Sequence, residues 1–455
     1  MDTFLSILQG VGLVIIGVLL FELIIFFHEG GHFICAKLSG VKVNEFALGM
    51  GPKLFSFKKG ETTYSLRLLP IGGFCAMEGE DEDSDNPRAF NNVKIWKRMI
   101  IVVAGAVMNI IFGLILMAII ISPMKVFGTS EINSFSPKSY SANCGLAEGD
   151  KILKINGYDI TNEMDLLYAV AKLKVQDVDG KTLQIYKEDA ANAIVSYYNT
   201  LYNLDSYEGF SEKSKTDMEA QCYEYINKVN SSTTKDEADK YYKECCNIMA
   251  SAFSDAQPKI PEISERETRK RFRADMLVER NGERVELKDV DFYTYTQGDD
   301  TTPKHSIDFW TVGKDKNFFT FIGETGSRTV SVVRMVGDSL VGLVSGQFGI
   351  SDVSGPVGAA SVTVQVAQEG LKSSFGDAVM NIVYVMMIIS VNLGVVNMLP
   401  FPALDGGRFL MLIIEGIFKK PVPRKVEAVI NGAGLVILLG FTLIITFKDI
   451  FQLIF

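Results

Sequence analysis

Two of the three histidines in this chain are four residues apart, and a glutamate directly follows the first, in the segment His28-Glu29-Gly30-Gly31-His32. On a helix, residues four apart project from one face, so both imidazoles can bind the same zinc ion. Glu29 lies beside them, where a carboxylate can take a proton from water held by the metal. A pair of capping or core histidines is the alternative. The setting argues against it, because a long apolar run leads directly into the motif and histidines at the end of a membrane span need a partner.

A catalytic zinc needs a third protein ligand and an open position for water. Asp405 is the best candidate, since it follows Pro400 and Pro402 directly after an apolar segment. Prolines free backbone groups, which is tolerated at membrane depth only where the backbone lines a cavity. The remaining histidine, His305, is excluded because it lies in the section predicted below to be on the other side of the membrane. A helix cap would explain Asp405 alone, but not two motifs that converge on one membrane face.

The composition separates apolar spans from a polar section. The 455 residues are 47% hydrophobic and 22% charged, and the net charge of −9 does not favour a nucleic-acid partner. Four apolar segments are long enough to cross a membrane, at about 5–27, 99–122, 380–399 and 428–447. The first is not a cleaved signal peptide, because it lacks a basic flank and carries the histidine motif.

The distribution of lysine and arginine predicts the orientation. The loops between spans one and two and between spans three and four are both basic, and four spans place them on one side. The positive-inside rule makes that side cytoplasmic. The section 123–326 and both termini then lie outside, and both metal motifs face the cytoplasm.

Short-range turn signals predict β-structure on both sides of the membrane. Lys59-Gly60-Glu61 joins two alternating runs and reads as a β-hairpin. The edge of such a sheet could take up an extended peptide segment as an added strand; a plain cytoplasmic connector is the alternative. In the external section, the Asn156-Gly157 and Asn281-Gly282 pairs indicate hairpins.

Between these two external hairpins lies a polar insertion at about 173–273. The stretches 218–229 and 235–250 within it read as helices. The insertion either binds a partner or is a neutral decoration, and we favour the second. After the external section, 328–343 has apolar residues at helical spacing, which indicates a helix on the outer membrane surface or a buried helix of the external domain.

Two polar residues lie inside the predicted spans. Asn109, close to Gly105 in the second span, needs a partner in the bilayer and so faces protein. Helix packing explains the presence of Asn109 and Gly105 at least as well as a catalytic role does. Glu22 lies two helical turns before Glu29, so we expect it either to face a hydrated cleft or to hydrogen-bond within the helix bundle.

The cysteines leave two alternatives open. Four of the six fall in the external section: Cys144, Cys222, Cys245 and Cys246. A disulfide from Cys222 to Cys245 or Cys246 is permitted there, and free thiols are as well supported. Cys35 and Cys75 lie near the metal motif and could be soft ligands, but small core residues fit better beside a carboxylate ligand.

Together these features resemble the site-2 protease family, in its bacterial branch with a PDZ domain between the second and third spans. The external pieces 141–160 and 276–287 resemble the two halves of a PDZ domain. The resemblance covers nearly the whole chain except the insertion and rests on four motifs: His28-Glu-Gly-Gly-His32, Gly105 to Asn109, Ser354-Gly-Pro-Val-Gly358, and Asn397-x-x-Pro-x-Pro-x-Leu-Asp405-Gly-Gly. Members often have Gly-Pro in the second motif, whereas this chain has Gly105-Ala106, so the local helix kink of the family is not implied here.

The resemblance implies an intramembrane zinc metalloendopeptidase. The residue roles that it implies are Zn²⁺ binding by His28, His32 and Asp405, general-base catalysis by Glu29, and substrate contact by Asn397 and Asn109. Expected substrates are single-span membrane proteins, such as anti-sigma factors or signal-peptide remnants, trimmed first by another protease because the PDZ domain would limit access. The expected location is the bacterial plasma membrane, with the PDZ domain outside and the active site towards the cytoplasm.

The expected fold is therefore an α-helical polytopic membrane protein with four transmembrane helices, a small membrane-associated β-hairpin or sheet, and an extracytoplasmic α+β PDZ domain with a helical insertion. The predicted divisions are transmembrane helix 1 at 1–38, a β region at 39–98, transmembrane helix 2 at 99–123, the PDZ domain at 124–300 with the insertion at 173–273, a linker and surface helix at 301–350, transmembrane helix 3 at 351–400, a cytoplasmic loop at 401–427, and transmembrane helix 4 at 428–455. A non-catalytic PDZ scaffold is the main alternative function, although the intact Glu29 argues against it. A metal transporter fits less well, because no second ionisable path crosses the bilayer.

Overall fold

The structure is a computed structural model that divides into two compact units. The first unit is Met1–Lys125 with Lys316–Phe455, and the second is Val126–Asp315. The structure describes residues 2–80, 82, 84–136, 139–179, 182–202, 212–252, 259–263, 268–292, 294–297, 300–347, 349, 353 and 355–454. Ser354, which opens the motif at 354–358, lies outside the described residues.

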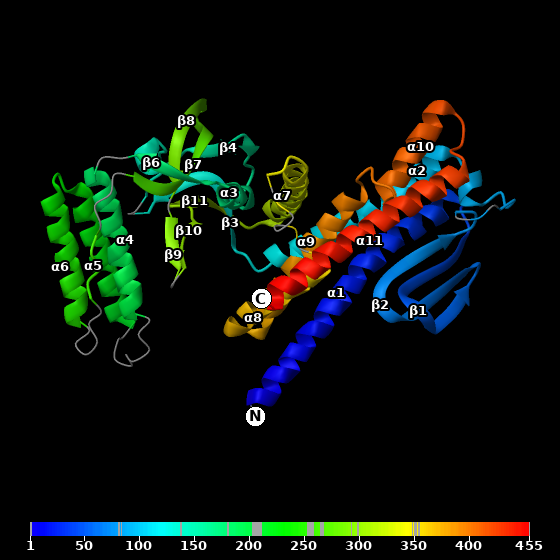
Figure 1. Ribbon diagram of the computed structural model, residues 1–455, viewed down its shortest axis with the longest axis horizontal. Coiled ribbons are helices and arrows are strands. Elements are labelled where there is room, and N and C mark those ends of the chain that lie inside the picture. Colours follow the sequence, from blue (N-terminus) through cyan, green and yellow to red (C-terminus); the bar gives the residue numbers. More distant parts are fainter. Residues whose placement is uncertain are drawn as a thin grey trace. The chain divides into compact units, whose positions relative to one another are not determined.

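Within the described part of the chain, four helices are long and apolar enough to cross a membrane. They are α1 (Asp2–Ser39), α2 (Ile95–Ile121), α9 (Phe375–Asn397) and α11 (Arg424–Ile454) (Figure 1). Each predicted span coincides with one of them. The third ends at Asn397 rather than 399, since Pro400 follows and the residues before a proline leave the helical region. Three further helices complete the unit: α7 (Phe318–Val344), α8 (Pro356–Ser373) and α10 (Asp405–Phe418).

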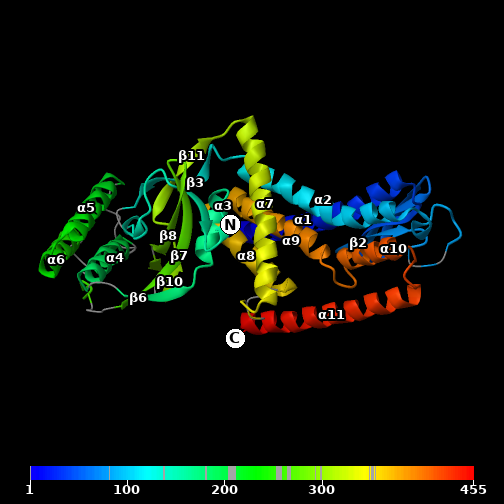
Figure 2. The same ribbon diagram turned by 90° about the horizontal axis from the view of Figure 1, so that it is seen from above.

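Helix α2 is the common packing partner of the first unit. It packs against α1, α7, α9 and α10 (Figure 2). It remains one continuous helix through Ala106, which is fully buried. A Cβ on Gly394 of α9 would lie 2.9 Å from the Ala106 carbonyl oxygen, so the two helices cross with their backbones close together. Because α2 packs closely against both α1 and α9, it can fix the distance between side chains of these two helices.

The predicted hairpin is confirmed, and it forms a wider sheet than one turn would give. β1 (Val43–Lys59) and β2 (Thr62–Met77) are both bent. The register pairs 45–48 with 63–66 on one side and 43–48 with 73–77 on the other, while 53–59 pairs with 62–67. The segment order is therefore 53–59, 62–67, 43–48, 73–77, and 73–77 is an edge. This edge is the part of the sheet nearest the histidine motif, as shown below.

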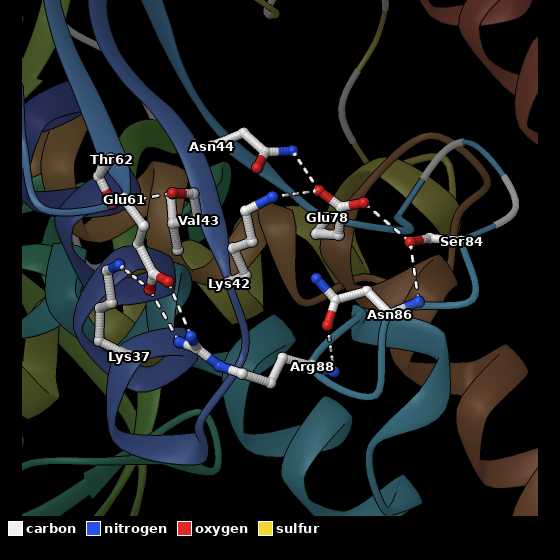
Figure 3. Close-up of polar contacts among 10 residues, drawn as sticks. All are labelled: Lys37, Lys42, Val43, Asn44, Glu61, Thr62, Glu78, Ser84, Asn86 and Arg88. Carbon is white, nitrogen blue, oxygen red and sulfur yellow. Dashed lines mark hydrogen bonds and ion pairs between the residues drawn. The ribbon is translucent and has the colours of Figure 1, made fainter.

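Ion pairs fix the turn end of this sheet to the end of α1 (Figure 3). The Glu61 carboxylate accepts from Arg88 at 2.7 and 2.8 Å and from Lys37 at 2.8 Å. These bonds, first from Arg88 and then from Lys37, lower the pKa of Glu61 to about 2. Glu78, at the other end of the hairpin, accepts from Lys42 at 3.0 Å. The hairpin is thus tied to the helix that carries the histidines.

The second unit is built on a seven-stranded sheet. The strand order is β11 (Phe309–Asp315), β3 (Val126–Phe135), β4 (Lys151–Ile155), β7 (Thr268–Arg280) and β6 (Val175–Asp179), with β5 (Tyr158–Asp159) on β4 and β8 (Glu283–Phe292) on β7. The pair β9 (Thr294–Gln297) and β10 (Asp300–His305) and the helix α3 (Glu163–Ala171) complete it.

Both predicted Asn-Gly hairpins are present in this sheet. Asn156 and Gly157 have φ of 46° and 81° between β4 and β5, and Asn281 and Gly282 have φ of 54° and 83° between β7 and β8. Asparagine and glycine are the residues that tolerate this left-handed pair of turn positions. The assignment of the unit as a PDZ domain stays a prediction.

The insertion contains three packed helices with a core of their own. They are α4 (Thr182–Tyr202), α5 (Glu212–Ser231) and α6 (Lys235–Ala252), and the last two contain both stretches predicted to be helical (Figure 1). Cys222, Cys245 and Cys246 lie in this core as free thiols, and all six cysteines are free in the described chain. The cysteines of the described chain are therefore arranged as in the free-thiol alternative.

Several boundaries differ from those expected from the sequence. The section 351–400, expected as one transmembrane helix, contains two helices, α8 and α9, with Ser374 in extended conformation between them. The second unit continues past 300 to Asp315, because β11 returns to pair with β3. The helix expected at 328–343 is α7, which begins at Phe318 and packs against α2 and α9 of the first unit. The alternative of a buried helix in the external domain is therefore wrong.

Candidate metal centre

Three side chains from the two predicted motifs meet in the first unit. The Nε2 atoms of His28 and His32 are 3.4 Å apart, and each lies 3.5 Å from Oδ2 of Asp405. Within the described chain, these residues form a group of potential ligands whose donor atoms all lie within 4.8 Å of one another. The meeting of residues almost the full length of the chain apart is the geometry that a metal site requires.

The spacing of these donor atoms fits zinc. Zinc ligands lie about 2.0–2.2 Å from the ion, so the edge of a zinc tetrahedron is about 3.3–3.6 Å. The three separations here are 3.4, 3.5 and 3.5 Å. Oδ2 of Asp405 is buried and has no hydrogen-bond partner among the described residues, which fits an oxygen that faces a cation. Two imidazoles, one carboxylate and one remaining vertex are the donor set of a catalytic zinc.

Close helix packing brings the two imidazoles to this position. A Cβ on Gly31 of α1 would lie 2.4 Å from the Ala104 carbonyl oxygen of α2. A Cβ on Gly105 would lie 2.3 Å from Nε2 of His32 and 2.8 Å from Cε1 of His28. Only glycine at 105 leaves room for both rings, so the predicted role of Gly105 in close approach extends to the site itself.

Asp405 reaches the site from a loop between two helices. α9 ends at Asn397, and Asp405 is the first residue of α10. The loop carries Pro400 and Pro402, and Ala403 has a φ of 70°, in the left-handed region. The Ala403 N–H donates to Oδ1 of Asn431 in α11 at 3.3 Å. The loop is therefore fixed at both ends, and it places the carboxylate at the start of a helix, where a negative charge is stabilised.

Glu29 lies in the cavity beside the three ligands. The cavity has a volume of about 480 Å³, and its lining includes Glu29 and residues 74–77 of β2. A Cβ on Gly73 of β2 would lie 3.4 Å from Cγ of Glu29, so the edge segment of the sheet lies close to this side chain. The edge segment thus forms one wall of the cavity, beside the predicted general base.

The sequence analysis did not identify two charged residues that line this cavity. Arg408 donates to Glu80 through Nη1, and both line the cavity. Arg408 lies one helical turn after Asp405, which could have indicated its position, but Glu80 lies in an acidic run with no comparable signal. The same pair also lines a second cavity of about 370 Å³, together with the buried pair Arg98 and Glu415.

The predicted amide residues both contact His28. The Nδ2 atom of Asn397 lies 3.5 Å from Nε2 of His28, and Nδ2 of Asn109 lies 3.2 Å from its Nδ1. The prediction that they contact substrate stays a prediction. Oε1 of Glu22 is buried without a hydrogen-bond partner in the described chain, and both expected roles of this residue stay predictions.

The residues set aside in the sequence lie apart from the ligand group. His305 donates through Nε2 to the Leu173 carbonyl at 2.7 Å, and its ring lies tilted against that of Phe272, within the second unit. Cys75 lines the cavity, but neither Cys75 nor Cys35 belongs to the described ligand group.

Comparison with known proteins gives matches along nearly the whole chain. The sequence model of peptidase family M50 matches residues 16–441. The regulator of sigma-W protease RasP of Bacillus subtilis is 29% identical over 464 residues, which cover 97% of this chain and 99% of the relative. The zinc metalloprotease RasP of Bacillus licheniformis is 31% identical over 462 residues, with the same coverage of 97% and 99%.

Proposed function

Because the chain belongs to peptidase family M50, as a zinc-dependent membrane metalloprotease of the site-2 type, we propose that it hydrolyses peptide bonds in or near the membrane-spanning segments of single-span proteins. The proposed zinc ligands are His28, His32 and Asp405. One observation carries the proposal: the three donor atoms have the separations of a zinc tetrahedron, beside a glutamate, in a unit of membrane-type helices.

The chemistry is divided between the metal and the side chains. Bound zinc supplies a Lewis acid that polarises the scissile carbonyl and makes water nucleophilic near neutral pH. Glu29 takes the proton of the attacking water and passes it to the leaving amine. The Asn397 amide lies next to His28 Nε2, where it can donate a hydrogen bond to the substrate backbone.

The substrate is held as an added strand. A transmembrane helix hides its carbonyls in its own hydrogen bonds, so it must unwind before cleavage. The 73–77 edge of β2 pairs with 43–48 on one side, and residues 74–77 line the cavity on the other. Strand addition there would present an extended substrate carbonyl to the metal and Glu29.

The proposed topology places this reaction towards the cytoplasm. The second unit would lie outside the cell as a PDZ domain and limit access to substrates already trimmed by another protease. One relative is named a regulator of sigma-W protease. By analogy, an anti-sigma factor is the leading substrate class for this chain, and remnant signal peptides are the second.

The test compares the detergent-purified protein with its Glu29→Gln variant. Bound zinc is quantified, and cleavage is followed on a tagged single-span substrate whose outer domain has been removed. We expect equal zinc in both proteins and a rate lower by about 10²- to 10⁴-fold in the variant. The His28→Ala and Asp405→Ala variants should lose zinc.

Two results would contradict the proposal. Stoichiometric zinc with no cleavage of any trimmed substrate would favour a non-catalytic PDZ scaffold. Wild-type zinc affinity in the His28→Ala variant would remove the ligand assignment.

A further inference from the structure

The two histidines use their ring nitrogens in the same way. Nε2 of each ring faces Oδ2 of Asp405 at 3.5 Å. On the other side of the His32 ring, Nδ1 lies 2.8 Å from the carbonyl oxygen of Ile101. A carbonyl only accepts, so Nδ1 of His32 carries the proton and Nε2 keeps its lone pair for a metal.

His28 has an amide in the corresponding position. Its Nδ1 lies 3.2 Å from Nδ2 of Asn109, on the facing side of α2. The Asn109 side chain is fully buried, and its Oδ1 has no hydrogen-bond partner among the described residues. A buried amide oxygen without a hydrogen-bond donor is energetically costly at membrane depth. The Asn109 oxygen is therefore expected to accept a hydrogen bond in the functional protein.

The chemistry of the ring decides which amide atom must face it. Once Nε2 of His28 binds a metal, Nδ1 carries the proton and becomes a donor. An amide NH₂ would then face it donor to donor. A half-turn of the Asn109 amide exchanges the two atoms in the same space and brings Oδ1 to Nδ1, where it accepts the proton.

We propose that Asn109 is a positioning residue of the metal centre, which fixes the tautomer and orientation of His28 by accepting from Nδ1. This inference rests on the proposed zinc ligands. Ligands held in this way by a further hydrogen bond bind the metal more tightly. The Ile101 carbonyl performs the same task for His32, so α2 supports both rings.

The backbone around Asn109 is itself held in place. Its carbonyl oxygen accepts from Oγ of Ser390 in α9 at 2.8 Å, and Ser390 is fully buried. The adjacent crossing of Gly394 on Ala106 brings the two backbones together. The amide is therefore presented to His28 from a rigid pair of helices.

The position of Asn109 distinguishes this role from substrate contact. Asn109 has no exposed surface, and it does not line the catalytic cavity. It approaches His28 from the side of the ring opposite the ligand group. A substrate in the cavity would meet Nε2 and Glu29 before it met this amide.

The test measures zinc affinity of the full-length purified protein by competition with a chromophoric chelator. We expect Asn109→Leu, which has similar size and no acceptor, to bind zinc about 10- to 100-fold more weakly. Asn109→Asp keeps an acceptor at the same place and should bind zinc at least as tightly as the wild type. Asn381→Leu is the matched control, because Asn381 donates to the Val366 carbonyl away from the metal, and its zinc affinity should not change.

Each result has a definite meaning. Wild-type zinc affinity in Asn109→Leu with a raised KM would overturn the proposal in favour of substrate contact. Equal losses in Asn109→Leu and Asn109→Asp would show that the amide donates to His28, which also overturns it. Cobalt absorption spectra and gel-filtration profiles of the variants separate a displaced ligand from a misfolded protein. Zinc retained by His28→Ala would refute the ligand assignment rather than this step.

Discussion

At the scale of single residues, the centre depends on which atoms face the three donors. Both histidine rings turn Nε2 towards Asp405 because their Nδ1 atoms are engaged by α2, one with a carbonyl and one with an amide. Histidines placed by a helix spacing alone could rotate about χ2 and present either nitrogen. The contacts from α2 therefore orient the His28 and His32 rings so that both Nε2 atoms can serve as potential metal ligands.

The cysteines near the site allow a sharp prediction at this scale. Cys75 lines the cavity, but its sulfur is not part of the described group of potential ligands, which consists of His28, His32 and Asp405. Burial, and then the charge of Glu29, raise the pKa of the Cys75 thiol, which disfavours the thiolate that metals bind. We expect the double variant Cys35→Ala/Cys75→Ala to keep zinc affinity within about threefold of wild type, short of the tenfold or greater loss expected for a supporting group.

Chelator competition on the purified protein measures this effect. A Cys35→Ala single variant serves as the control, since Cys35 lies outside the cavity lining. A loss of bound zinc in the double variant would mean that a thiol is a ligand and that the carboxylate assignment is wrong.

At the scale of elements, the site exists because α1 and α2 cross at glycine. The two imidazoles fill the space where Gly105 lacks a side chain, and Gly31 lies against the Ala104 carbonyl of the same turn. A single added methyl group at 105 would overlap both rings. Displacement of a ligand by about 1 Å is enough to impair a preorganised site.

We therefore expect Gly105→Ala to lower zinc affinity by at least about tenfold, comparable to the loss of a supporting interaction. Gly30→Ala is the matched control, because a Cβ at Gly30 meets nothing within 4 Å. Zinc per protein after purification in both variants tests the prediction. Full zinc occupancy in Gly105→Ala would show that the crossing relaxes without consequence for the ligands.

At the scale of the whole molecule, features that depend on side-chain type could be predicted from the sequence, whereas contacts made by backbone atoms could not. The meeting of His28, His32 and Asp405 in one group of potential ligands was predictable, since few residue types bind zinc and the spacing of the two histidines follows the helix. The four spans were predictable from apolar length. The Ile101 carbonyl contact and the pairing of 43–48 with two segments of β2 were not predictable, because any residue supplies the same backbone atoms.

The boundary of the second unit was missed for a related reason. β11 joins the sheet by pairing with β3, which lies about 180 residues earlier in the chain, and long-range pairing of this kind leaves little local signal. The attachment of helix α4 to the sheet also depends on contacts between residues far apart in the sequence. Arg271 of β7 pairs with Glu188 of α4, and its guanidinium lies 4.1 Å from the ring of Tyr140.

This buried pair joins helix α4 to strand β7 of the sheet. The side chains of Arg271 and Glu188 are only 3% and 7% exposed. Loss of one partner would leave a buried charge, which costs about 3–5 kcal/mol, whereas replacement of both by apolar residues is often neutral. We expect Arg271→Met to destabilise the unit by about that amount and Arg271→Met/Glu188→Leu to recover most of it.

Hydrogen exchange of α4 peptides in the full-length protein reports this stability. Lys243→Ala is the control, since its pair with Asp239 is exposed and should contribute less than about 1 kcal/mol. Zinc content and cleavage of a trimmed substrate should stay unchanged in all variants, because the ligand group belongs entirely to the first unit. An unchanged exchange rate in Arg271→Met would refute the coupling of insertion and sheet, and lost cleavage with intact zinc would give the insertion a part in substrate selection.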